Sequence, residues 1–312
     1  TNLGPAVGGT RLFPYPSVDE ALQDVLRLAR GMTYKSALAG LPFGGGKAVI
    51  LAAPEDKTPQ LFKAFGTFVN QLHGQYICAE DMNTSPADME IVHSVTPHVA
   101  GLNRDGGDPS PFTALGVLSC IEATAKHLGI PVVGLRVTVQ GIGAVGRRLV
   151  ELLTEAGCTV FVADRNPHKM DEVIDATGCK GVYPDQVLYT PCDILAPCAM
   201  GGILNDDNIP KLRCKAVVGA ANNQLAEPRH ARQLQQLDIL YAPDYLVNAG
   251  GITNVAIERQ VGGYNLKSAV QAARAIGPRL LELYHFAETH NLNTAEAADL
   301  MAEQRFMKGP KV

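Results

Sequence analysis

The sequence predicts an α/β protein of two domains, the second of which is built on a doubly wound parallel sheet. Three observations carry this prediction. The chain has 312 residues, a length that usually divides into two domains. Short apolar runs alternate with helical segments after residue 130, which is typical of parallel strands covered on both faces. Between the two halves lies "NRDGGDPSP", residues 103–111, whose Gly, Asp, Pro and Ser residues are typical of a domain boundary.

The first half alternates helices and strands. A helix is predicted over residues 17–37, with a capping box formed by Ser17 and Glu20. Its apolar stripe is Ala21, Leu22, Val25, Leu28 and Ala29. The elements predicted after it are a buried strand over 44–53, a helix over 58–72, a short strand over 75–82 and a helix over 85–95.

The second half begins with a helix predicted over residues 112–129. Five apolar strands are predicted at 136–140, 159–164, 192–198, 215–222 and 238–243, and helices are predicted at 269–290 and 295–306. We expect the last helices to pack back on the first domain. The predicted domains are therefore residues 1–111 with about 285–312, and residues 112–284.

The composition excludes several classes of partner. Hydrophobic residues make up 46 % of the chain and charged residues 19 %, which permits a large core. The net charge is −4 and no basic run occurs, so nucleic acid and anionic membranes are poor partners. Seven cysteines without a C-x-x-C pair argue against a metal site and favour reduced, buried thiols in the cytoplasm. We also expect a further segment before Thr1, since the chain begins without Met and within what looks like an element.

The motif "GIGAVG", residues 141–146, predicts a dinucleotide site in a Rossmann-type domain. A strand precedes Gly141, Gly143 and Gly146, and the helix that follows begins around Ala144 and Val145. The glycines allow a tight turn against a pyrophosphate at the positive end of the helix. Asp164 ends the next strand, where its carboxylate suits ribose hydroxyls and repels a 2′-phosphate, so NAD is favoured over NADP. Arg165 weakens this preference because an arginine can hold the extra phosphate.

Ligands of such a fold bind at the carboxyl ends of the strands. Cys198 ends the predicted strand over 192–198 and Ala199 follows it, and Ala221 is the last but one residue of the strand over 215–222. We expect all three to line the dinucleotide site. Cys198 has no paired base in view, so lining is the better interpretation than a nucleophile.

The stretch "LPFGGGKAVI", residues 41–50, brings three glycines against Lys47. A P-loop would need glycine at Leu41 and a hydroxyl at Ala48, and it would follow a strand rather than precede one. A triphosphate site is therefore disfavoured.

A nicotinamide enzyme needs groups that move protons. The candidates in the first half are Lys35, Lys47, Glu80 and Asp81. Lys47 opens a strongly apolar strand, and partial burial near a second cation, Lys35, would lower its pKa until it can act as a base.

The same residues carry a family resemblance. The motifs "GPAVGGTR", "GMTYKSALAGLPFGGGKAVI", "AEDMNTSPADM", "PSPFTALGV", "GAANNQL" and "YAPDYLVNAGGITNV" resemble those of the leucine, phenylalanine, valine and tryptophan dehydrogenases, within the glutamate dehydrogenase superfamily. The resemblance covers essentially the whole chain. It implies reversible oxidative deamination of an L-amino acid with NAD⁺ and water. It also implies an N-terminal substrate and oligomerisation domain, a catalytic cleft between the domains, and a homo-oligomer.

The resemblance also implies roles for single residues. Lys35 resembles the group that binds the substrate carboxylate, Lys47 the catalytic lysine that activates water, and Asp81 the acid that exchanges protons with the amine. The Gly9 carbonyl and Asn223 resemble groups that orient the substrate. Thr113 and Asn248 resemble contacts to the nicotinamide end, and Asn222 a contact to its ribose. The glycines before Lys47 are interpreted as room for the substrate.

The preferred substrate is predicted to be apolar. Glutamate members of the superfamily resemble this chain but carry lysine in place of Val7, so a substrate side-chain carboxylate would lack a partner here. Ala79, Ile252 and Val255 resemble the pocket wall and are all apolar. Leucine and valine are favoured over phenylalanine and tryptophan, although pocket size discriminates weakly between them. A non-catalytic NAD-binding protein is the alternative from another class, and the presence of Lys47 and Asp81 argues against it.

Overall fold

The computed structural model describes residues 1–102, 107–259 and 263–308, which form two compact units. Unit 1 comprises the described residues of Thr1–Pro109, Ile252–Leu266 and Met301–Val312, and unit 2 comprises Ser110–Gly251 and Lys267–Leu300. Unit 1 gives way to unit 2 after Pro109, close to the predicted boundary, of which residues 103–106 lie outside the described part. Within the described residues, 252–259 and 263–266 lie in unit 1 and 285–300 lie in unit 2, which differs from the predicted grouping.

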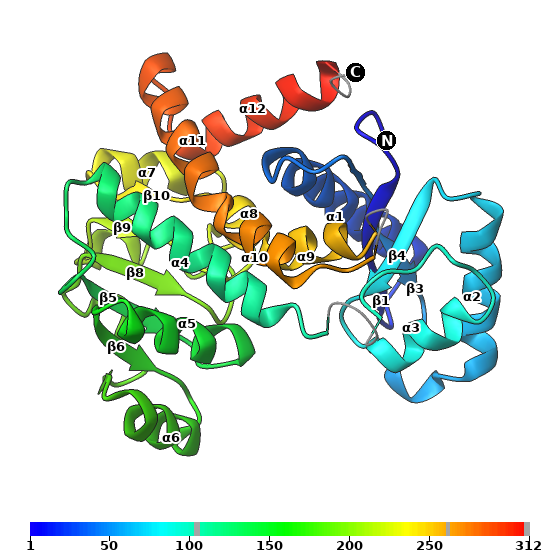
Figure 1. The fold of residues 1–312 in the computed structure, drawn as a ribbon, viewed down its shortest axis with the longest axis horizontal. Helices are drawn as coiled ribbons and strands as arrows, with labels where there is room; N and C mark the ends of the chain where they lie inside the picture. Colours follow the sequence, from blue (N-terminus) through cyan, green and yellow to red (C-terminus); the bar gives the residue numbers. More distant parts are fainter. Residues whose placement is uncertain (103–106, 260–262, 309–312) are drawn as a thin grey trace. The chain divides into compact units, whose positions relative to one another are not determined.

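Unit 1 contains a parallel sheet whose central strand is β1 (Ala6–Leu12) (Figure 1). One edge of β1 pairs with β2 (Gly44–Gly45) and then β3 (Ala48–Ile50), and the other edge pairs with β4 (Tyr76–Glu80). The strand predicted over 44–53 is thus two short strands, which keep one register along β1 and are interrupted at Gly46 and Lys47.

The central strand β1 is absent from the predicted elements because Gly8 and Gly9 lower its β propensity. Pairing on both edges compensates for this low propensity. A Cβ at Gly8 would lie 1.7 Å from the carbonyl oxygen of Gly46, so only glycine lets β1 approach the lysine-bearing segment this closely.

Three helices of unit 1 match predicted segments, namely α1 (Val18–Leu38), α2 (Pro59–Gln71) and α3 (Pro86–His93). Ser17, Thr58 and Ser85 cap them, since each hydroxyl accepts a hydrogen bond from the N–H three residues later. Two further helices, α9 (Gly250–Glu258) and α12 (Thr294–Lys308), begin in unit 2 and end in unit 1.

The exposed side of α1 differs from the prediction. Ala21 is buried as expected, but Leu22 is exposed, and so are Val18 one turn before it and Leu26 one turn after it. The predicted apolar stripe is therefore wrong at Leu22. We call Val18, Leu22 and Leu26 the α1 surface row.

Unit 2 is built on a six-stranded parallel sheet in the order β10 (Leu240–Tyr241), β9 (Ala216–Val217), β8 (Ile194–Pro197), β5 (Arg136–Gln140), β6 (Thr159–Ala163) and β7 (Lys180–Gly181). All five predicted strands are present, and β7, with two residues, was too short to predict. The order runs one way from β5 to β7 and the other way from β8 to β10. The loops after β5 and β8 therefore diverge at a topological switch point.

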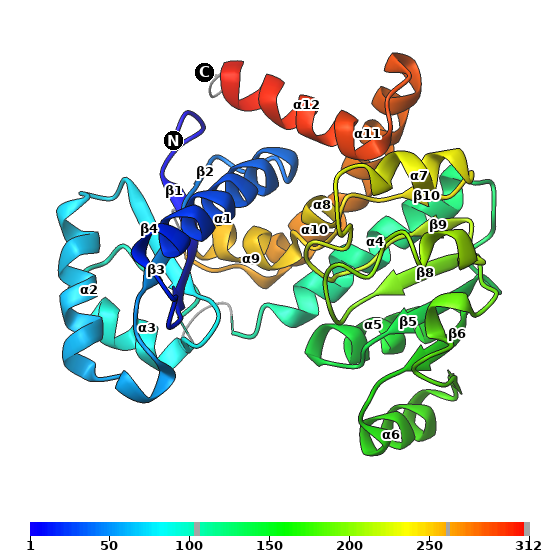
Figure 2. The same ribbon diagram turned by 180° about the vertical axis from the view of Figure 1, so that it is seen from behind.

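Helices cover the sheet of unit 2. They are α4 (Ser110–His127), α5 (Ala144–Glu155), α6 (Pro167–Thr177), α7 (His230–Gln236), α8 (Asp244–Val247), α10 (Leu266–Arg274) and α11 (Ile276–His290), with short 3-10 helices at Val187–Tyr189 and Ile209–Lys211. Figure 1 shows α4 between α5 and α11 on one side of the sheet, and Figure 2 views the strands from the other side. The carboxyl ends of the strands are thereby left for the loops that carry the predicted site.

All seven cysteines lie in the described part and are free thiols. Burial raises the pKa of each of them, in Cys198 to about 11. Cys198 is therefore protonated at neutral pH, which fits the lining role and not that of a nucleophile. Among the described helices, none is both long and apolar enough to cross a membrane.

Candidate active site

Lys47 lies in the interruption between β2 and β3, and only 6 % of its side chain is exposed. Its Nζ lies 2.8 Å from Oδ1 of Asp81, which directly follows β4. The strands that lead to these two residues flank β1, and Gly9 of β1 pairs with Ala79. A Cβ at Gly9 would lie 2.7 Å from Cβ of Asp81, so the glycine keeps the space beside this ion pair open. The structure thus brings together two of the predicted catalytic residues.

Arg11 extends this pair into a chain of alternating charges that also includes Asp24. Nε of Arg11 lies 3.0 Å from Oδ2 of Asp81, and its Nη1 lies 2.9 Å from Oδ2 of Asp24. The Tyr15 hydroxyl donates to the same oxygen of Asp24 at 2.5 Å. We call Lys47, Asp81, Arg11 and Asp24 the charge chain. Arg11 was missed by the sequence analysis, and the only signal for it was a guanidinium in an otherwise uncharged strand.

The surroundings of the charge chain shift the pKa values of its members. Burial, the largest effect, lowers the pKa of the Lys47 amine; Asp81 opposes this shift, Arg11 adds to it, and the net direction is downward. This direction agrees with the predicted lowering, and Arg11 is a cation that contributes to it, while a contribution from Lys35 stays a prediction. Burial alone would raise the pKa of Asp81, yet Lys47, the Met82 N–H and Arg11 outweigh it, so this pKa is lowered. Asp81 is therefore ionised, and Lys47 releases its proton more easily than an exposed lysine.

The glycines before Lys47 serve packing within unit 1. A Cβ at Gly45 would lie 1.9 Å from the backbone nitrogen of Thr33 on α1, and one at Gly46 would lie 2.7 Å from the ring of Tyr76. The interpretation that these glycines leave room for substrate is wrong at Gly45 and Gly46, because protein atoms fill that space. Lys35 is half-buried in the last turn of α1, two residues after Thr33, and its carboxylate-binding role stays a prediction.

The predicted wall residues all belong to unit 1. Val7 lies on β1 and is buried, and Ala79 lies on β4 and is half-buried. Ile252 is buried and Val255 half-buried on α9. Each offers only apolar atoms, but their contact with a substrate stays a prediction.

The glycine motif of unit 2 fits a dinucleotide. Gly141 directly follows β5 and has φ +92°, in the left-handed region. A Cβ at Gly146 would lie 2.0 Å from the carbonyl oxygen of Gly141, so glycine is needed for the close approach of α5. No side chain caps α5, whose N-cap is the exposed Gly143. The first N–H groups of this helix, at Ala144 and Val145, are thus available to a phosphate.

Asp164 directly follows β6 and holds the glycine loop. Its Oδ2 accepts a hydrogen bond from the Ile142 N–H at 2.7 Å, and its Oδ1 accepts one from the Asn166 N–H at 2.9 Å. Burial alone would raise the pKa of Asp164, but these N–H donors outweigh burial, so the pKa is lowered. The residue is therefore ionised, as a ribose-binding carboxylate must be. Arg165 beside it is exposed.

The loops after β8 and β9 carry the other predicted cofactor residues. A Cβ at Gly141 would lie 2.6 Å from Cβ of Ala199, which with Cys198 follows β8, so the loops on both sides of the switch point are in contact. Asn248 Nδ2 donates to Oδ1 of Asn222 at 2.7 Å. Ala221, next to Asn222, is buried, and Thr113 lies on α4.

Asn223 adopts the left-handed conformation with φ +53°. Its N–H donates to Oδ2 of the buried Asp244 at 2.5 Å, and the Tyr241 hydroxyl donates to Oδ1 of the same carboxylate at 3.1 Å. Asp244 was missed by the sequence analysis because its partner lies 21 residues earlier in the chain. It fixes the loop that carries Asn222 and Asn223.

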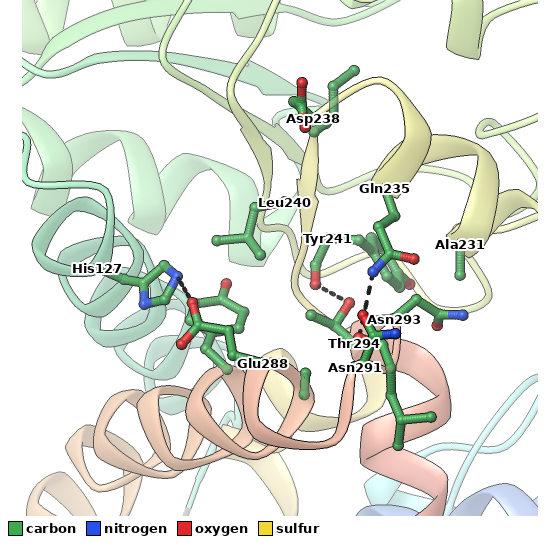
Figure 3. Close-up of a pocket in the computed structure, with 14 residues that line it drawn as sticks. His127, Ala231, Gln235, Asp238, Leu240, Tyr241, Glu288, Asn291, Asn293 and Thr294 are labelled. Atoms are coloured by element: carbon green, nitrogen blue, oxygen red, sulfur yellow. Dashed lines mark hydrogen bonds and ion pairs between the residues drawn. The ribbon is translucent and has the colours of Figure 1, made fainter.

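A cavity of about 450 Å³ lies elsewhere in unit 2 (Figure 3). It is lined by Leu240 at the start of β10 and by residues at the ends of α4, α7 and α11, among them His127, Gln235 and Glu288. Nε2 of His127 lies 3.3 Å from Oε1 of Glu288. The strands of this sheet are parallel, and Gly141 lies at the carboxyl end of β5, whereas Leu240 lies at the amino end of β10. The cavity is therefore separate from the glycine loop. None of the predicted site residues lines it.

Asp206, Glu227 and His230 bring their ligand atoms within 4.8 Å of one another. Nδ1 of His230 accepts a hydrogen bond from the Glu227 N–H at 2.9 Å, so the neutral ring carries its proton on Nε2, and that nitrogen has no lone pair for a metal. Arg229 lies 2.5 Å from a carboxylate oxygen of Asp206 and 2.9 Å from one of Glu227. A guanidinium thus already balances these carboxylates, and we assign no metal to the cluster.

Comparisons with known proteins bear on the chain as a whole. The family model "Glu/Leu/Phe/Val dehydrogenase, dimerisation domain" matches residues 1–98, and the model "Glutamate/Leucine/Phenylalanine/Valine dehydrogenase" matches residues 162–269. The chain is 45 % identical to leucine dehydrogenase of Geobacillus stearothermophilus over 98 % of its length and 84 % of that relative. It is 44 % identical to phenylalanine dehydrogenase of Thermoactinomyces intermedius over 99 % of its length and 86 % of that relative. The crystal structure of L-tryptophan dehydrogenase from Nostoc punctiforme matches with a TM-score of 0.90 at 40 % identity, covering 99 % of this chain and 90 % of that one.

Proposed function

Because the chain belongs to the Glu/Leu/Phe/Val dehydrogenase family and is an amino acid dehydrogenase, we propose that it oxidatively deaminates an apolar L-amino acid with NAD⁺. The amino acid, NAD⁺ and water give the 2-oxo acid, ammonium, NADH and a proton, and the reaction is reversible. The buried pair of Lys47 and Asp81 carries this proposal, because a lysine of lowered pKa beside an ionised carboxylate suits proton transfer to and from an amine.

The family works with a nicotinamide cofactor, and NAD is the form that this chain's residues favour. Gly141, Gly143 and Gly146 with the uncapped start of α5 would hold the pyrophosphate, and the ionised Asp164 would bind the ribose hydroxyls and repel a 2′-phosphate. When bound, NAD⁺ supplies the acceptor for the hydride that leaves the substrate Cα.

Asp81 begins the chemistry as the base for the substrate amine. An L-amino acid arrives as an ammonium, and its hydride can leave only after the nitrogen has lost a proton. The ionised Asp81 carboxylate takes that proton, and Lys35 is proposed to bind the substrate carboxylate.

Lys47 then serves hydrolysis of the imine. Its neutral amine takes a proton from the water that attacks the imine carbon, and the resulting lysine cation stabilises negative charge that develops on the oxygen. Lys47 then passes its proton to solvent, and Asp81 returns its own proton to the nitrogen. The nitrogen leaves as ammonia while the hydroxyl proton passes to the neutral Lys47 and the carbonyl forms. The lowered pKa of Lys47 makes the neutral form accessible.

Branched aliphatic amino acids are the proposed substrates, with aromatic ones as the alternative. The predicted pocket wall offers no charged partner for a side-chain carboxylate of the substrate; its residues are Val7, Ala79, Ile252 and Val255. The β-branched residues among them narrow the predicted pocket. Sequence identity does not separate the two classes, because it is 45 % to a leucine enzyme and 44 % to a phenylalanine enzyme.

We further propose that the protein is a cytoplasmic homo-oligomer. The model of a dimerisation domain matches residues 1–98, and the α1 surface row presents Val18, Leu22 and Leu26 on that part of the chain. Free thiols throughout the described chain fit a reducing compartment.

A substrate panel tests the proposal. Leucine, valine, phenylalanine, tryptophan and glutamate are each supplied with saturating NAD⁺, and NADH is followed at 340 nm, with NADP⁺ as the parallel series. We expect turnover of leucine and valine, weaker turnover of the aromatic substrates, and none of glutamate. Absence of turnover with every apolar amino acid, with NAD⁺ still bound, would support the non-catalytic alternative instead.

A further inference from the structure

We propose that Arg11 is a positioning residue of the deamination, which holds one oxygen of Asp81 so that the other stays on Lys47. This inference rests on the proposed function. It stands on the geometry of one carboxylate: Oδ1 of Asp81 lies 2.8 Å from the lysine amine, and Oδ2 lies 3.0 Å from Nε of Arg11. With each oxygen engaged by a different cation, the carboxylate is held in one orientation.

The orientation would otherwise be loose. The χ2 torsion of an aspartate is broad and nearly two-fold, so a carboxylate held only by Lys47 and the Met82 N–H has more freedom to rotate. Asp81 is 27 % exposed, and water could replace a missing donor. A rotated carboxylate would meet the substrate amine in poor geometry, and misplacement of about 1 Å can cost roughly 100-fold in rate.

Arg11 is itself held in place. Its Nη1 binds Oδ2 of Asp24 at 2.9 Å, and Asp24 also accepts a hydrogen bond from Tyr15 and pairs with Arg27 through Oδ1 at 2.9 Å. The side chains of Arg11 and Asp24 are 18 % and 15 % exposed. A guanidinium is suited to this bridge because its planar fork donates in two fixed directions, whereas a lysine would offer a single ammonium.

The charge of Arg11 also acts on both proton-transfer groups. The Arg11 cation lowers the pKa of Lys47, and its hydrogen bond lowers the pKa of Asp81. Further charged or titratable groups of the described chain that act on the pair include Asp24 of α1 and Glu80 and Tyr76 of β4. These remain in an Arg11 variant, so a shifted pH profile would be due to the lost guanidinium.

Two variants separate the geometry of Arg11 from its charge. In Arg11→Met the side chain is neutral, and we expect kcat to fall about 10- to 100-fold, together with a shift of the acid limb of kcat/KM toward higher pH. In Arg11→Lys the charge is kept but the fork is lost. We expect the acid limb of the kcat/KM profile to stay near that of the wild type while kcat falls. Asp24→Asn removes the anchor of Arg11 and should give a smaller loss of kcat.

Lys57→Met is the matched control. Lys57 is a half-buried cation of the same unit, 2.8 Å from Oδ2 of Asp88, and it has no contact with the charge chain. Its removal should change thermal stability without moving kcat or the pH limb. Loss of folded protein alone would lower the active fraction of any variant, but it would leave the pH dependence unchanged.

The positioning role is overturned if Arg11→Met folds, binds NAD⁺ and keeps both the kcat and the pH limb of the wild type. It is also overturned if Lys57→Met shifts the limb as much as Arg11→Met does. Failure of the proposed function looks different, because the wild type itself would then oxidise none of the apolar amino acids.

Discussion

The candidate sites of the two units are held together by different kinds of chemical group. In unit 1, charged side chains hold one another: Lys47, Asp81, Arg11 and Asp24 form the charge chain with separations of 2.8 to 3.0 Å. In unit 2, backbone and amide groups dominate. The carboxylates of Asp164 and Asp244 there accept N–H donors from loops, and no described cation lies within ion-pair distance of Asp164.

This difference separates two kinds of effect. Charges in unit 1 change one another's pKa, so substitutions there should alter rate and pH dependence together. Hydrogen bonds to the backbone in unit 2 fix loop shape, so substitutions there should alter cofactor affinity and selectivity and leave the chemical step nearly intact.

The sharpest test of the contrast is Lys47→Ala. We expect kcat to fall about 10⁴-fold, because the base that activates water is lost, while NAD⁺ affinity measured by calorimetry stays near normal. Lys63→Ala, at an exposed lysine of α2, is the control and should keep full activity. Activity of Lys47→Ala within tenfold of the wild type would remove Lys47 from the mechanism.

The pH dependence of the wild type follows from the lowered pKa of Lys47. Only the neutral amine accepts a proton, so kcat/KM for the amino acid should rise about tenfold per pH unit and reach its plateau below the ordinary range of a lysine. Asp81 raises the pKa of Lys47, so Asp81→Asn should move this limb to lower pH, opposite to Arg11→Met, while kcat falls. A limb that is unmoved in both variants would show that another group controls it.

For unit 2, Asp164→Ala should raise the KM for NAD⁺ about tenfold and improve the use of NADP⁺, because the acceptor for the ribose hydroxyls and the repulsion of a 2′-phosphate are both lost. The value of kcat at saturating NAD⁺ should change little. Asp171→Ala, on the exposed side of α6, is the control. An unchanged ratio of the two cofactors would contradict the ribose role of Asp164.

The smallest expected effect is on substrate choice. Val7→Ala removes two methyl groups, and we expect the ratio of kcat/KM for phenylalanine to that for leucine to rise about tenfold. Val69→Ala makes the same change in the buried core of unit 1, on α2, and controls for lost packing. Equal ratios in Val7→Ala and the wild type would take Val7 out of the substrate pocket.

The fold of unit 2 was largely predictable, and the comparisons confirm the family resemblance. Its strands are continuous apolar runs because both faces of a parallel sheet are covered, and the glycine motif has the same local meaning in any chain. The central strand of unit 1 was missed because Gly8 and Gly9 are poor strand residues. Pairing of β1 on both edges, which no local pattern records, overrides their propensity.

Within the site, Lys47 and Asp81 could be selected as candidates because each adjoins an apolar strand. Their partners could not be predicted. The contact of Arg11 with Asp81 spans 70 residues of sequence, and that of Asp244 with Asn223 spans 21. Such pairings depend on register and strand order. The interpretation of the glycines before Lys47 as room for the substrate failed for a related reason. The atoms that fill the space beside Gly45 and Gly46 come from α1 and β4, which are distant in sequence.

The seven free thiols have a practical consequence. Burial keeps each of them protonated in ordinary buffers, and alkylating reagents attack the thiolate. A cysteine introduced at an exposed position, for example at Lys63, would therefore react with a maleimide dye well before the native ones. Fluorescent labelling at a chosen point would thus require no prior removal of the natural cysteines.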